Sequence, residues 1–94
     1  MAGKIHKLSI SKSINMVTGS GGMVLAKEEV QIPEGCVGIL SVRRSYGNNK
    51  LSVTSQFLDE GFCGRPELHL LNGGNDLELP AGRQLVNLVI VQAF

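Results

Sequence analysis

The hydrophobic residues of this 94-residue chain occur in short runs that glycine-rich segments separate. No window keeps a helical spacing of apolar residues for three turns, whereas Val, Ile and Leu gather in stretches of strand length. We therefore predict an all-β protein with almost no helix. The predicted strands are residues 4–10, 23–31, 36–43, 50–57, 64–71 and 83–92, with a short strand near 76–79.

Turn signals rich in Gly, Pro and Asn separate the predicted strands. They lie at residues 18–22, 33–35, 46–49, 60–61, 72–75 and 80–82. Residues 32–35 and 79–82 share the form apolar-Pro-x-Gly, in which proline presets φ and glycine accepts a positive φ. Both predict tight corners where the chain passes from one sheet to another, an arrangement typical of a sandwich or a jelly-roll barrel.

The predicted strand at residues 83–92 is apolar on both faces over its second half. Such a strand needs cover on its outer face, either from the sandwich of the same chain or from another subunit. We treat residues 1–94 as one domain, and a domain of this size buries only about two-thirds of the surface of its unfolded chain. Association into an oligomer would therefore add stability.

Charge and composition exclude several classes of protein. The formal net charge is +1, too small for a general nucleic-acid or membrane binder. We find no secretory leader and no apolar run near the ~18 residues that a membrane span needs, so we expect a cytoplasmic protein. Cys36 and Cys63 form no CxxC pair, and His6 and His69 lack partners at ligand spacing, so neither a disulfide nor a metal site is expected.

The run Arg44-Ser45-Tyr46-Gly47 is the first candidate for binding chemistry. A guanidinium fork, a hydroxyl and turn amides all suit the oxygens of a phosphate group. Arg43, at the end of a predicted strand, is as well explained by a solvated edge that discourages pairing between sheets.

The second candidate is the run at residues 57–64, which contains Asp59 and Phe62. Asp59 either contacts a ligand, most simply a sugar hydroxyl, or bonds the amides of its own turn. Phe62 and Phe57 either stack on a base or pack in the core. Arg65 and Arg83, each at the start of a strand, can add positive charge to a pocket.

From Val30 to Phe94 the ordered motifs resemble the superfamily of trimeric dUTPases and dCTP deaminases. The resemblance implies a distorted jelly-roll β-barrel of the dUTPase-like type, assembled as a trimer with ligand sites at the subunit interfaces. The run at residues 59–64, Asp-x-Gly-aromatic-x-Gly, leans toward the deaminase branch. The matching segments are residues 32–40, 44–45, 58–64, 68–72 and 82–88.

The resemblance also assigns roles to particular residues. Arg44 and Ser45 stand where the family's Arg-Ser-Ser loop grips phosphates, with Tyr46 in place of the second Ser. Asp59 stands where the family's aspartate faces the sugar and, in dUTPases, orients the attacking water. Asn87 stands where a Gln usually contacts phosphate. Together with the residue chemistry, this gives the candidate ligand-binding set Arg44, Ser45, Tyr46, Gly47, Asp59, Phe62, Arg83 and Asn87.

The sequence departs from both enzymes of the resemblance. It lacks the early Ala-Gly-x-Asp motif of dUTPases and, because the chain stops at Phe94, their carboxy-terminal arm. On the deaminase side, His69 replaces the catalytic Glu and Asn49 replaces an Arg. We therefore expect a protein that binds a linear or cyclic nucleotide without efficient catalysis, as a nucleotide-sequestering phage product would in a bacterial or infected host cell. No cofactor is expected, except Mg²⁺ if the ligand is a triphosphate.

Two alternatives remain open from the sequence. One is a minimal dUTPase-like or dCTP deaminase-like nucleotide hydrolase in which Asp59 orients the water and the substrate phosphates hold Mg²⁺. The other is a structural or decoration protein that reuses the barrel and binds no ligand, for which Arg44 would be dispensable.

Overall fold

The computed structural model describes residues 5–47 and 50–92, and it confirms the all-β prediction. A single helical turn, α1, interrupts the strands of the described residues where a loop was expected. Asn48 and Asn49, predicted in the turn after Tyr46, lie outside the described residues. The elements are β1 (Ile5–Ser9), β2 (Ile14–Met16), β3 (Gly21–Leu25), β4 (Val30–Gln31), β5 (Cys36–Val42), α1 (Arg44–Gly47), β6 (Leu51–Val53), β7 (Phe57–Leu58), β8 (Cys63–Gly64), β9 (Glu67–Asn72), β10 (Leu77–Leu79) and β11 (Gln84–Gln92).

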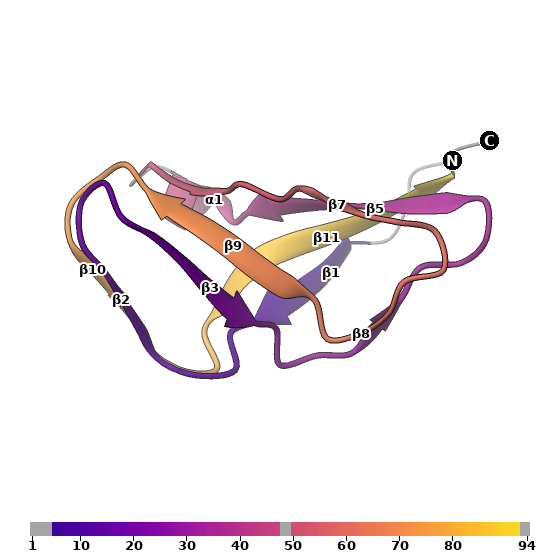
Figure 1. The fold of residues 1–94 in the computed structure, drawn as a ribbon, viewed down its shortest axis with the longest axis horizontal. Helices are drawn as coiled ribbons and strands as arrows, with labels where there is room; N and C mark the ends of the chain where they lie inside the picture. Colours follow the sequence, from indigo (N-terminus) through magenta and orange to yellow (C-terminus); the bar gives the residue numbers. More distant parts are fainter. Residues whose placement is uncertain (1–4, 48–49, 93–94) are drawn as a thin grey trace.

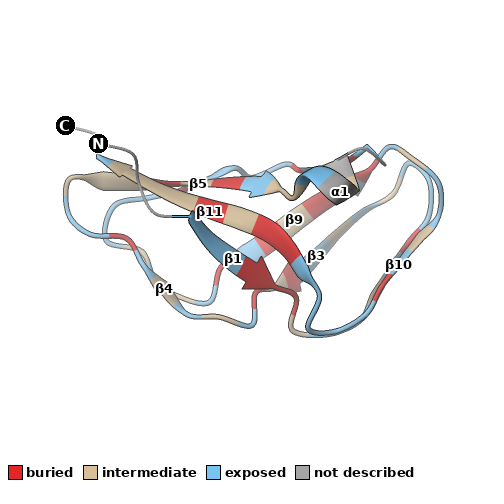
Figure 2. Cartoon of the chain, turned by 180° about the vertical axis from the view of Figure 1, so that it is seen from behind, coloured by how far each residue is buried: buried red, intermediate tan, exposed pale blue. Residues whose placement is uncertain are grey.

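Two antiparallel sheets form the body of the structure. The main sheet has the order β1-β11-β5-β7, and the second sheet has the order β3-β9-β6. β3 and β9 cross in front of β1 and β11 in Figure 1, and Figure 2 shows the same two layers from behind. The core between the layers takes Leu40, Leu88 and Val86 from the main sheet and Leu68 and Leu70 from the second sheet.

Two small strand pairs extend the sandwich at its ends. β2 pairs with β10 at one end, and β4 pairs with β8 at the other (Figure 1). The described strands thus form four separate sheets rather than one closed barrel. The jelly-roll character predicted from the sequence stands, but the closure implied by the word barrel is not seen in the described residues.

Three predicted strands are broken in the structure. The strand expected at 64–71 divides into β8, which pairs with β4, and β9, which pairs with β3. The strand expected at 23–31 ends at Leu25, because the backbone of Lys27 turns to donate to Ser9 O (2.8 Å) while the Glu28 carboxylate accepts from Ser9 N (2.7 Å). The strand expected at 50–57 divides because the chain changes sheets: β6 pairs with β9, and β7 pairs with β5. β2, at residues 14–16, was not predicted at all.

The outer face of the main sheet carries a continuous apolar row. Ile5, Val89, Ile39 and Phe57 are paired in register across the four strands, and the two edge residues of the row, Ile5 and Phe57, are 65% and 63% exposed. β11 is therefore central in the sheet of its own chain, yet its outer face still presents apolar side chains. We call these four residues the outer row.

The short helical turn α1 is the only helix among the described residues, and nothing described there forms a helix long and apolar enough to cross a membrane.

Candidate functional site

The candidate residues lie toward opposite ends of β5. Arg44 and Tyr46 belong to α1, which begins two residues after β5 ends at Val42. Asp59 directly follows Leu58 of β7, which pairs with Gly38 in the first half of β5. At about 3.3 Å per strand residue, Arg44 and Asp59 are roughly 20 Å apart along the sheet. One chain therefore does not bring the two predicted halves of the site together.

The first half-site is a cluster of side chains that joins α1 to the start of β11. The guanidinium of Arg83 donates through Nη1 to Tyr46 Oη at 2.6 Å, and Tyr46 packs half-buried against the core. Arg43 donates its backbone N–H to Leu85 O at 2.9 Å. These contacts fix α1 next to β11, while the side chain of Arg44 stays exposed.

This cluster is positively charged. Among the described residues, no carboxylate lies within ion-pair distance of Arg43, Arg44 or Arg83. Each guanidinium has five N–H donors, and most of them have no acceptor within the described chain. Ser45 and Gly47 occupy the same helical turn. The cluster therefore offers charged donors that suit an anion such as a phosphate group.

The second half-site is built on a rigid turn at residues 59–62. Phe62 N donates to Asp59 O (3.1 Å), Gly61 N donates to Ile32 O (2.9 Å), and Gly61 has a φ of 82° that favours glycine. The carboxylate of Glu60 accepts from Gly35 N and ties this turn to the neighbouring corner. Glu60, rather than Asp59, thus provides the side-chain bond of the turn.

The Asp59 carboxylate is exposed and accepts no hydrogen bond from the described residues. Its backbone carbonyl serves the turn instead. The sequence offered two roles for the Asp59 side chain: contact with a ligand, or bonds to the amides of its own turn. In the structure it makes no bond to those amides. The carboxylate is available to a ligand.

Asp59 opens into a cleft of about 730 Å³, a size that falls in the range of small-molecule sites. The cleft lies between the 55–63 segment and the outer face of β9. Its lining combines aromatic, acidic and basic side chains, among them Phe57, Asp59, Phe62, Arg65, Glu67 and His69. Such a mixture can hold a flat ring and hydrogen-bond its polar edges.

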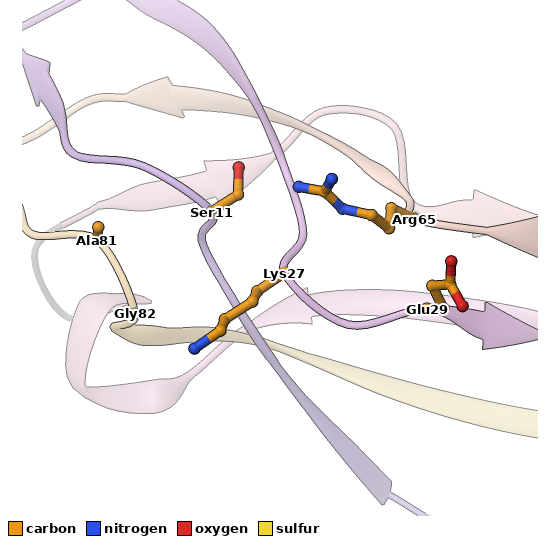
Figure 3. Close-up of a pocket in the computed structure, with 6 residues that line it drawn as sticks. All are labelled: Ser11, Lys27, Glu29, Arg65, Ala81 and Gly82. Atoms are coloured by element: carbon orange, nitrogen blue, oxygen red, sulfur yellow. The ribbon is translucent and has the colours of Figure 1, made fainter.

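Arg65 separates this cleft from a second pocket, of about 520 Å³, which Figure 3 shows. Its Nε donates to Ala26 O at 2.9 Å, which fixes the guanidinium in the wall between the two cavities. From the sequence, Arg65 was known only as a residue at the start of a predicted strand that could add positive charge to a pocket. The bond to Ala26 spans 39 residues and leaves no local signal in the sequence.

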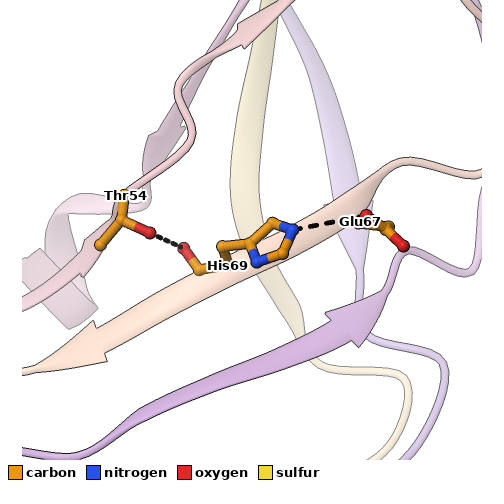
Figure 4. A network of polar contacts seen from close by, with 3 residues as sticks. All are labelled: Thr54, Glu67 and His69. Carbon is orange, nitrogen blue, oxygen red and sulfur yellow. Dashed lines mark hydrogen bonds and ion pairs between the residues drawn. The ribbon is translucent and has the colours of Figure 1, made fainter.

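His69, which has no sequence partner at metal-ligand spacing, does have a side-chain partner in the structure. Its Nε2 lies 3.4 Å from Glu67 Oε1 (Figure 4). Both side chains line the cleft that also contains Asp59. Residues two apart in a strand share one face of the sheet, so the Glu-x-His spacing was a signal that could have revealed this pair. The pair supplies an imidazole and a carboxylate that can donate to or accept from a ligand.

Asn87 belongs to neither half-site. It lies in β11 between Lys7 of β1 and Ser41 of β5, next to the outer row. Its Oδ1 is buried and has no hydrogen-bond partner among the described residues. A buried acceptor without a donor costs about 1–3 kcal/mol.

A family model described as dCTP deaminase-like matches residues 3–93, almost the whole chain. The chain belongs to the dCTP deaminase-like family. The superfamily predicted from the sequence motifs is thereby confirmed. This dCTP deaminase-like chain is also similar to a dCTP deaminase of Hyperthermus butylicus, with 26% identity over 65 residues, or 69% of the chain. It spans only 37% of the length of that relative.

Solved dUTPases share the fold of the dCTP deaminase-like chain. The EIAV dUTPase has a TM-score of 0.83 with 21% identity, over 92% of this chain and 72% of its own. A variant dUTPase of Staphylococcus bacteriophage 80alpha with dUpNHpp has a TM-score of 0.87 with 15% identity, over 100% of this chain and 83% of its own. The dUTPase of phage phi11 of S. aureus has a TM-score of 0.86 with 17% identity, over 96% and 77%. At these identities the likeness establishes the fold.

The different roles of Asp59 and Glu60 lead to a prediction about stability. Glu60→Ala removes the bond to Gly35 N and should lower the free energy of unfolding by about 0.5–1 kcal/mol, a small value because the group is exposed. Asp59→Ala removes no such bond and should stay within about 0.5 kcal/mol of the parent chain. Urea denaturation followed by circular dichroism measures both. A larger loss for Asp59→Ala than for Glu60→Ala would show that Asp59 is the structural residue.

Proposed function

We propose that this dCTP deaminase-like chain binds a nucleotide at sites shared between copies of a homo-oligomer and does not catalyse efficiently. The observation that carries the proposal is the division of the candidate residues. The cationic cluster around Arg44 and the cleft around Asp59 lie at opposite ends of β5. A single nucleotide can engage both only if they come from two different copies.

The two halves have complementary chemistry for a nucleotide. Arg44, Arg83 and the Tyr46 hydroxyl would hold phosphate oxygens through charged and neutral donors. The cleft would receive the sugar and base, with the Asp59 carboxylate accepting from a sugar hydroxyl and Phe62 packing on the ring. The bacteriophage 80alpha dUTPase variant of the same fold was solved with dUpNHpp, which supports a nucleotide as the ligand class.

The outer row supports the assembly. Four apolar side chains aligned across a sheet form a surface that a second copy can cover. We propose a trimer, because the chain is small and because each site then receives one half from each of two neighbours. Sequestration of a linear or cyclic nucleotide is the role we propose for it, since His69 stands in the position of the deaminase Glu.

Light scattering coupled to size exclusion tests the assembly. The parent chain should be a homotrimer, and Phe57→Asp should shift it toward monomer because it places a charge on the outer row. Met23→Asp is the matched control: Met23 is also an exposed apolar residue, at 47%, but lies on the second sheet. A parent chain that is monomeric at micromolar concentration would contradict the shared site, as would equal effects of the two variants.

Calorimetry with linear and cyclic nucleotides tests the ligand. Arg44→Ala should weaken binding roughly ten- to a hundredfold, because a charge-assisted bond contributes about 1.5–3 kcal/mol. Arg44→Lys should restore only part of the affinity, since an ammonium lacks the guanidinium fork. Lys12→Ala, which removes an exposed charge elsewhere, is the control and should bind like the parent chain. If the parent chain binds no nucleotide, or if Arg44→Ala binds as well as the parent, the proposal fails in favour of a structural protein.

One observation favours a minimal hydrolase as a second candidate. The unbonded Asp59 carboxylate shares its cleft with the His69–Glu67 pair, so groups able to move a proton are present together. A triphosphate substrate would bring its own Mg²⁺ in this case.

Product analysis by chromatography separates the two candidates. After hours with dUTP or dCTP and Mg²⁺ we expect no conversion, or conversion far below the ~1–10³ s⁻¹ of ordinary enzymes. Conversion at enzyme-like rates that Asp59→Asn abolishes would instead establish the hydrolase.

A further inference from the structure

The pocket on the other side of Arg65 is built by four segments that are distant in the sequence. Ser11 comes from the connection after β1, Lys27 and Glu29 from the connection between β3 and β4, Arg65 from the step between β8 and β9, and Gly82 from the turn before β11. Its volume of about 520 Å³ is in the range of ligand sites. None of the eight candidate ligand-binding residues lines it, and Arg65 is the only residue that it shares with the lining of the Asp59 cleft.

Arg65 is held in position to bind an anion there. Its Nε is already bonded to Ala26 O, so the guanidinium is oriented before any ligand arrives, and its two terminal nitrogens remain as donors. Figure 3 shows the guanidinium pointing toward the side of the pocket where Ser11 presents its hydroxyl. A fixed arginine loses little conformational entropy on binding, which favours affinity.

The remaining charges make the pocket weakly cationic. Lys27 also lines it and extends toward the turn at Gly82 in Figure 3, and its flexible stem can redirect the ammonium toward a ligand. Glu29 contributes one opposing carboxylate. Among the described residues, neither Lys27 nor Arg65 makes an ion pair within 4.0 Å, so Glu29 does not neutralise either cation by contact.

We propose that this pocket binds a phosphate group through Arg65, Lys27 and the hydroxyl of Ser11. Two cations and a hydroxyl around a polar hollow match the charge and the acceptor oxygens of a phosphate. The group can be free inorganic phosphate or the phosphate of a nucleoside monophosphate. The site shares only the wall residue Arg65 with the cleft of Asp59, so it stands whether or not the proposed nucleotide site does.

The proposal is tested by adding inorganic phosphate to the protein and following its binding by phosphorus-31 NMR. Two variants should change the phosphate affinity in opposite directions. Lys27→Gln should weaken phosphate binding about three- to fivefold, because it removes one exposed cation. Glu29→Gln should strengthen binding by a similar factor, because it removes the opposing carboxylate. Lys12→Gln is the matched control. It also removes one lysine charge, next to Ser11 in the sequence, but Lys12 does not line the pocket, so the variant should bind like the parent chain.

Further arms separate the sources of the phosphate and the two proposed sites. Tighter binding of uridine or adenosine monophosphate, with the same pattern across the variants, supports a nucleotide phosphate, and equal or weaker binding supports free phosphate. The titrations are repeated in the Arg44→Ala background, which removes the proposed phosphate-binding arginine of the nucleotide site, and there Lys27→Gln should still weaken and Glu29→Gln still strengthen phosphate binding. The proposal is overturned if millimolar phosphate causes no change in the spectrum, or if Lys27→Gln and Glu29→Gln bind phosphate as the parent does.

Discussion

The antiparallel register between β11 and β5 fixes where every candidate residue lies. Because Val86 pairs with Val42, the residues after β5 meet the residues before β11, and Tyr46 reaches Arg83. The first half of β5 pairs with β7, and this pairing positions the turn that contains Asp59. A slip of one residue would exchange the two faces of β11, so that Val89 would leave the outer row for the core and Leu88 would face outward. The same pairing thus sets the core, the outer face and both half-sites.

Much of this fold could be predicted from local patterns. The runs that became β5 and β11 are long and rich in β-branched residues, and the apolar-Pro-x-Gly corners stand in the structure as turns. What could not be predicted depends on distant partners. Residues 27–29 leave the strand conformation because Ser9 bonds the backbone N–H of Lys27 and the carboxylate of Glu28. Residues 53–57 change sheets because β9 and β5 offer different edges, and neither edge is visible in the local sequence.

The candidate site divides in the same way. Arg44 and Asp59 were found because their residue types stand out in a strand-rich sequence, and the structure leaves both side chains exposed. The bond between Arg83 and Tyr46 joins residues 37 positions apart, so no local pattern predicts it. The separation of Arg44 from Asp59 is likewise a property of strand pairing. Only the His69–Glu67 pair was open to prediction, since its two residues are alternate positions of one strand.

The pairing of β1 with β11 has a consequence for how the chain folds. It joins Ile5 to Val89, so the four-stranded main sheet is complete only when segments from opposite ends of the sequence have found each other. Closing such a large loop lowers the entropy of the chain before the contacts of the sheet can compensate. Folds dominated by distant pairings therefore form slowly, in about milliseconds to seconds. Until β11 docks, β5 has one open edge with a run of valine, isoleucine and leucine beside it. During that interval β11 of another copy can pair with β5 as well as the chain's own strand can, which makes exchange of this strand between copies a built-in hazard of folding at high concentration.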